Sequence, residues 1–178
     1  MKKLALSLIS AFLLLMMPQA TAANTVIRIT GPIHQTFTGE FRNDDLAQSL
    51  TPSGDLGLKV FQPIAKNRTW VIDAALIDEV IVMSGDYTLA TEAEPAGKEI
   101  ATAWLTQLKR VTTGNDVVAL AYGNPDIALA QRLAPSELKN YFVYGQDRLQ
   151  LALGRIVRSE PEVQWSVGKS GLRAITSP

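Results

Sequence analysis

The sequence predicts an α/β protein with a small, open or truncated parallel sheet flanked by helices, resembling part of a β/α barrel. Short apolar runs of strand-forming residues alternate with segments of helical periodicity, and those segments are long enough to connect parallel strands. The third observation is the number of predicted strands, which limits the size of the sheet. Four strands cannot close an eight-stranded barrel of about 250 residues. The predicted strands span residues 25–30, 69–72, 117–121 and 163–167.

Each strand is predicted from its side chains and from the turn residues that bound it. Residues 25–30 are rich in β-branched side chains and are stopped by Gly31-Pro32. Residues 69–72 and 117–121 are nearly continuous apolar runs, which are typical of strands covered on both faces. Residues 163–167 are predicted as the last strand, with no helix after them.

The helices are predicted from apolar residues at three- and four-residue spacing and from capping residues. Ser53 is expected to cap the first helix, and Asp73 stands where the second needs a cap. Asn124-Pro125-Asp126 is expected to open the fourth helix, with Asn124 as its cap. Residues 35–52 are predicted as a loop with at most one helical turn. The helical segments cover residues 54–66, 75–85, 100–111, 127–135 and 136–156.

The N-terminus has the pattern of an export signal. Lys2 and Lys3 precede an apolar run from Leu4 to Met17, and Ala20-Thr21-Ala22 offers the small residues that signal peptidase requires. The 14 residues of that run are fewer than the roughly 20 that span a bilayer. We therefore expect residues 1–22 to be a cleaved signal peptide, residues 23–178 to form a single α/β domain, and the product to be secreted or extracytoplasmic, without membrane association.

Composition excludes several classes of chemistry. Basic and acidic residues are equal at 17 each, so loss of Lys2 and Lys3 leaves a net charge of −2, which argues against nucleic acid as a partner. The chain has no cysteine and one histidine, His34. It therefore cannot form a disulfide framework, a thiol nucleophile or a metal site of the kind that a metal-dependent deacetylase needs. No metal and no cofactor are expected.

Polar residues at the ends of two predicted strands are the candidate site. Ligands gather at the carboxyl ends of parallel strands, where Asp73 follows one strand and Tyr122 and Asp126 follow another. Asp73 and Asp126 are the candidate catalytic pair, because glycoside hydrolysis uses two carboxylates. Tyr122 and Asn124 are the candidate ligand-binding residues. The alternative, which we favour, is that both acids cap helices.

Two stretches, Trp70–Asp78 and Val118–Ala128, resemble a family of large, uncharacterised exported proteins of actinobacteria. In that family a strand ends in an acid before a leucine-rich helix, and a later strand ends in a Tyr-Gly-Asp-Pro-Asp-like turn. Here Asn124 stands in place of the first acid of that turn. The resemblance implies an N-terminal α/β region similar to glycoside hydrolases or polysaccharide deacetylases, and a location at the cell envelope.

These observations together predict an exported protein of the cell envelope that is a non-enzymatic binding module, with a cell-wall glycan or another envelope protein as its partner. One alternative is a glycoside hydrolase-like enzyme that uses Asp73 and Asp126. A second alternative is that the chain is the N-terminal fragment of a larger envelope protein, incomplete at its C-terminus. Trp70, Trp104 and Trp165 are predicted to pack in the core rather than to stack on sugars.

Overall fold

The structure is a computed structural model that describes residues 25–62, 68–159, 163–168 and 171–176. For the last two ranges only the backbone is described. The expected signal peptide, residues 1–22, and the side chain of Trp165 lie outside the described parts.

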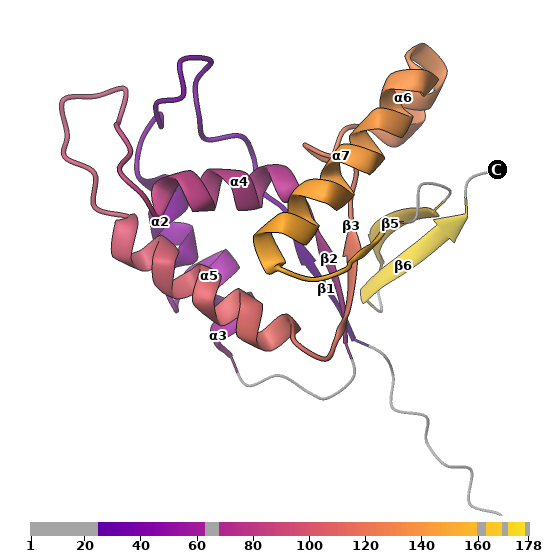
Figure 1. Cartoon of the computed structure of the whole chain (residues 1–178), viewed down its shortest axis with the longest axis horizontal. Coiled ribbons are helices and arrows are strands. Elements are labelled where there is room, and N and C mark those ends of the chain that lie inside the picture. The colour runs from indigo at the N-terminus through magenta and orange to yellow at the C-terminus, as the bar shows by residue number, and fades with distance from the viewer. Residues whose placement is uncertain (1–24, 63–67, 160–162, 169–170, 177–178) are drawn as a thin grey trace, which may run out of the picture.

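A parallel sheet of four strands forms the centre of the fold, which confirms the predicted α/β class (Figure 1). Its strands are β1 (Thr25–Ile29), β2 (Arg68–Ile72), β3 (Asp116–Ala119) and β4 (Arg158–Ser159), in the order β1-β2-β3-β4. In register, Ile29 pairs with Ile72 and Ile72 with Ala119, so the first three strands end at the same edge of the sheet.

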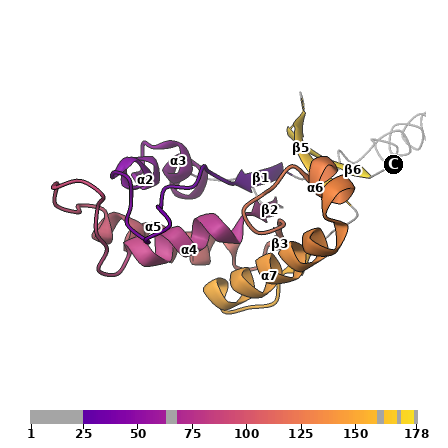
Figure 2. The ribbon, with the colours of Figure 1, turned by 90° about the horizontal axis from the view of Figure 1, so that it is seen from above.

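The strand predicted at residues 163–167 is confirmed, but its predicted place in the parallel sheet is wrong. Residues 163–167 belong to β5 (Val163–Gly168), which pairs antiparallel with β6 (Gly171–Thr176) in a separate two-stranded sheet. The fourth parallel strand is β4, which has two residues and is too short to give a periodic pattern. The β5–β6 hairpin lies on the side of the sheet opposite to α4 and α7, with β6 beside β1 (Figure 2).

The helices connect successive strands, and α4, α5 and α7 pack on one side of the sheet (Figure 2). Trp70 and Trp104 are fully buried between the sheet and these helices, which confirms the prediction for these two tryptophans. Val71, Val118 and Leu120 point to the other face, where they form a second buried cluster. The helices are α2 (Asp45–Leu50), α3 (Asp55–Phe61), α4 (Ala74–Met83), α5 (Lys98–Thr112), α6 (Ile127–Leu133) and α7 (Pro135–Leu153).

Helix starts differ from the predictions at two places. The N-cap of α3 is Gly54 rather than Ser53, and the helix ends at Phe61 rather than at residue 66. The N-cap of α6 is Asp126, whose side chain accepts a hydrogen bond from the backbone N–H of Leu129. Asn124 cannot be that cap because it adopts a left-handed backbone conformation, with φ of 43°, in the turn before it. The predicted cap of α4, Asp73, is confirmed.

Candidate functional site

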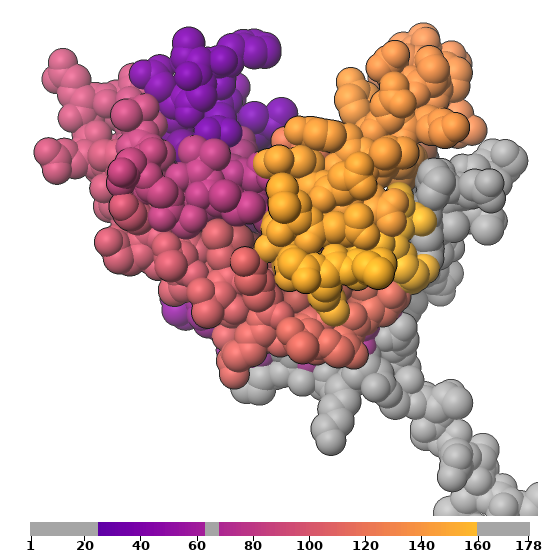
Figure 3. Space-filling view, in the orientation of Figure 1, coloured from indigo at the N-terminus to yellow at the C-terminus, as the bar shows by residue number. Residues whose placement is uncertain are grey.

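A cleft of about 820 Å³ lies at the carboxyl ends of β1, β2 and β3. The surface is hollowed between the loop that follows β1 and the arm formed by α6 and α7 (Figure 3). Its walls come from that loop, from the first half of α4 and from the turn after β3. The lining residues are Gly31, Pro32, Ile33, Gln35, Thr36, Phe37, Arg42, Asp73, Ala75, Leu76, Asp78, Glu79, Tyr122 and Gly123.

Asp73 is the buried carboxylate of the cleft, with only 2% of its surface exposed. Its Oδ1 accepts hydrogen bonds from the backbone N–H of Ala75, at 3.0 Å, and of Gly123, also at 3.0 Å. Within the described part of the chain, no hydrogen bond reaches Oδ2. Asp73 thus holds the start of α4 and the turn after β3 together through one oxygen.

Burial raises the pKa of Asp73, although the two N–H groups and the nearby positive charge of Arg28 act in the opposite direction. Arg28 reaches from β1 across the strand ends, where its Nη2 donates to Oδ1 of Asn124 at 2.7 Å. Burial lowers the pKa of this guanidinium. Asn124, predicted to bind a ligand, therefore has a carboxamide oxygen that is already engaged and a backbone conformation that asparagine tolerates well.

The raised pKa of Asp73 gives a pH-dependent stability. The folded protein binds this proton more tightly than the unfolded chain, so folded-state stability is lost as pH rises from the ordinary value of 3.8 through the raised pKa. Asp73→Asn keeps the shape and does not titrate. We expect the difference in free energy of unfolding between Asp73→Asn and wild type to increase as pH rises above 3.8 and through the raised pKa of Asp73. Urea unfolding followed by tryptophan fluorescence measures this free-energy difference at each pH. A difference that stays constant or falls as pH rises would contradict the raised pKa of Asp73.

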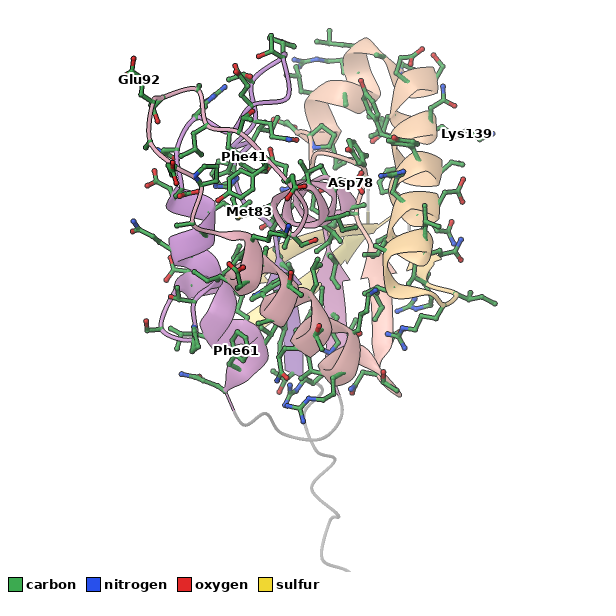
Figure 4. The ribbon with its side chains drawn as sticks, turned by 60° about the vertical axis from the view of Figure 1, so that its left-hand side comes forward. Phe41, Phe61, Asp78, Met83, Glu92 and Lys139 are labelled. Atoms are coloured by element: carbon green, nitrogen blue, oxygen red, sulfur yellow. The ribbon has the colours of Figure 1, made fainter. Side chains whose placement is uncertain are left out.

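Asp78 joins α4 to α7 at the side of the cleft (Figure 4). Arg148 donates to both of its oxygens, from Nη2 to Oδ1 at 2.8 Å and from Nε to Oδ2 at 2.9 Å. The hydroxyl of Tyr122 donates to the same Oδ2 at 3.0 Å, and burial together with the Asp78 charge raises the pKa of Tyr122. The Tyr122 ring also packs edge-on against Tyr144, with centroids 4.7 Å apart. Tyr122 lines the cleft, and its hydroxyl joins the turn after β3 to α4 through Asp78, while its ring contacts Tyr144 of α7.

Glu79 attaches the loop after β1 to α4. Its Oε1 accepts from the backbone N–H of His34 at 2.8 Å and of Gln35 at 3.0 Å, and its Oε2 lies 2.9 Å from Nδ1 of His34. Glu79 is itself buried. A buried carboxylate with three partners fixes the start of the loop, and therefore the position of the side chains that follow it at the rim of the cleft.

The second candidate acid lies elsewhere. Asp126 is exposed, its Oδ1 accepts from the N–H of Leu129 at 2.9 Å, and it is not among the residues that line the cleft. The cleft instead brings Asp73 together with Asp78 and Glu79. Sequence reasoning missed both, although Glu79 follows the apolar Leu76 by three residues and so lies on the same face of the helix.

The described residues contain no group of three or more histidine, cysteine, aspartate or glutamate side chains placed to hold a metal ion. Among the helices that the structure describes, none combines the length and the apolar character needed to cross a bilayer.

Comparison of the sequence with protein-family models and with curated proteins found no match.

Proposed function

We propose that this protein is exported to the cell envelope, where it binds a cell-wall glycan in the cleft at the carboxyl edge of the sheet, without catalysing a reaction. The observation that carries the proposal is Asp73, a buried carboxylate that lines the cleft with one oxygen bonded to the backbone and the other without a protein partner in the described structure. An oxygen that faces a cleft and has no protein partner is available to accept a hydrogen bond from a ligand hydroxyl.

The chemistry of the cleft suits a saccharide. Sugar rings combine hydroxyl donors with a flat apolar face, and sites for them combine acceptors with exposed aromatic or aliphatic surface. Phe37 is fully exposed and Ile33 largely so, and both line the cleft. Exposed apolar side chains and a buried carboxylate in the lining of one cleft support a ligand that stacks on the former and donates a hydroxyl to the latter.

The apolar rim is held in place before a ligand arrives. Glu79 binds the backbone at His34 and Gln35, and a turn closed by the hydrogen bond from Thr36 N–H to the Glu40 carbonyl follows immediately. Gly39 occupies that turn with φ of +88°, a conformation that favours glycine. Phe37 therefore stands on an ordered turn, which reduces the entropy lost on binding.

The other carboxylates of the cleft favour binding over hydrolysis, because each already has protein hydrogen-bond partners. A glycosidase needs a second carboxyl group opposite the first, free to act as a base or nucleophile. Asp78 is held by Arg148 and Tyr122, and Glu79 is held by the loop. The hydrolase alternative with Asp73 and Asp126 is favoured only by the raised pKa of Asp73, which suits a general acid. Release of new reducing ends from a wall glycan by the wild type would support it.

Two isosteric variants test the proposal. Asp73→Asn should keep the acceptor for Ala75 and Gly123 but turn the second oxygen into a donor, so we expect wall-glycan affinity to fall by about tenfold or more. Asp126→Asn makes the same chemical change at an exposed cap outside the cleft and should bind as the wild type does. Isothermal titration with soluble wall-glycan fragments measures both. Equal affinities for Asp73→Asn and wild type would reject the site.

Export is tested separately. If residues 1–22 are a signal peptide, the intact mass of the natural product should correspond to a chain that begins at Ala23, and the product should be found outside the inner membrane. A full-length mass in the cytoplasmic fraction would reject the proposed location without bearing on the cleft.

A further inference from the structure

Arg42 supplies the positive charge in the lining of the cleft. Its backbone N–H donates to the carbonyl of His34 at 3.0 Å, so this residue closes the base of the same loop that carries Phe37. Its side chain is exposed, and in the described structure its guanidinium makes no hydrogen bond or ion pair. A guanidinium that lines a cleft without a protein partner has its donors free for a ligand.

Each carboxylate that lines the cleft is stabilised by neighbouring protein groups. Asp78 is paired with Arg148, and Asp73 lies in the field of Arg28. Glu79 is satisfied by two backbone N–H groups and by His34. Among the charged side chains of the described lining, Arg42 is therefore the one that makes no hydrogen bond or ion pair with the protein, and it lies on the loop rather than at the buried end of the cleft.

We propose that the ligand is an acidic saccharide, whose carboxylate binds Arg42 while a hydroxyl of the same ligand donates to Oδ2 of Asp73. This inference rests on the proposed glycan binding and further specifies that the glycan carries a negative charge. Arginine forms two parallel hydrogen bonds with a carboxylate, and these charge-assisted bonds are stronger than neutral ones. A singly charged carboxylate is favoured over a doubly charged phosphate because Asp73, Asp78 and Glu79 line the same cleft and repel added negative charge.

A pair of disaccharides that differ in one carboxyl-bearing substituent tests the inference. N-acetylglucosaminyl-N-acetylmuramic acid carries a lactyl carboxylate, and N,N′-diacetylchitobiose lacks it. We expect the wild type to bind the acidic disaccharide about tenfold more tightly in isothermal titration at low salt, and the preference to shrink as salt is added. Arg42→Gln should remove the preference. Arg110→Gln changes an exposed arginine of α5 outside the cleft and should retain it.

The outcomes separate the two proposals. If the wild type binds both disaccharides equally, or if the preference persists in Arg42→Gln, the ligand is not selected by Arg42 and the inference is overturned while glycan binding stands. If N-acetylglucosamine 6-phosphate binds more tightly than either disaccharide, the carboxylate is the wrong anion. If none of these sugars binds and wall-glycan fragments fail as well, the proposed function falls with the inference.

Discussion

Gly145→Ala should lower the free energy of unfolding by about 3 kcal/mol, although alanine is the better helix former by about 1 kcal/mol. A Cβ at Gly145 would overlap the backbone carbonyl oxygen of Leu120 and lie 3.1 Å from the backbone nitrogen of Tyr122. Neither atom can turn away as a flexible side chain could. The variant must therefore push α7 away from the end of β3, where the Tyr122 N–H donates to the Tyr141 carbonyl at 3.0 Å.

The matched control is Gly85→Ala, at the end of α4. An added Cβ there meets its nearest atom at 3.4 Å, which is ordinary contact. Its free energy of unfolding should change by less than about 0.5 kcal/mol. Urea denaturation followed by the fluorescence of the buried Trp70 and Trp104 compares the two variants. Equal stabilities for the two would mean that α7 does not approach the sheet as closely as described.

Asp73→Ala should lower the free energy of unfolding by about 2 to 3 kcal/mol, whereas Asp73→Asn should stay within about 1 kcal/mol of the wild type at acidic pH. Alanine removes both the cap of α4 and the partner of the Gly123 N–H. Asparagine keeps the accepting oxygen and is as good a cap as aspartate.

Asp126→Ala is the comparison for the same measurement. It removes one hydrogen bond at the exposed start of the seven-residue α6, so the expected loss is about 1 kcal/mol or less. If Asp73→Ala and Asp126→Ala destabilise equally, Asp73 is an ordinary cap and the second bond to Gly123 contributes nothing. If Asp73→Asn is as damaging as Asp73→Ala, the accepting oxygen does not explain the role of Asp73.

Local patterns were sufficient for the strands of the sheet interior and for the long helices. The strands β2 and β3 can be recognised from their apolar runs, because a strand buried on both faces has few polar residues. β4 could not be found this way. It has two residues, and Arg158 is held beside Asp116 by two hydrogen bonds of 2.8 and 2.6 Å, a contact between residues 42 positions apart. The antiparallel pairing of β5 with β6 also went unrecognised, because periodicity does not reveal a partner strand.

The site was predictable only where the strand ends define it. The rule that ligands gather at the carboxyl edge placed Asp73 and Tyr122, and both line the cleft. It gave no account of Phe37 or Arg42, because their loop reaches the cleft through a contact with Glu79 in a different element. It also could not separate Asp73 from Asp126, since each caps a helix and only the folded chain shows which one is buried.

If a glycan hydroxyl binds Oδ2 of Asp73, as we propose, the backbone amide resonances next to this carboxylate should report the binding. The N–H groups of Ala75 and Gly123 donate to the other oxygen of this carboxylate, whereas the N–H of Leu129 donates to Asp126. In an NMR titration with N-acetylglucosaminyl-N-acetylmuramic acid, we expect saturable shifts of the Ala75 and Gly123 amides and none of the Leu129 amide. Unchanged Ala75 and Gly123 resonances at saturation, or a shift confined to Leu129, would contradict it.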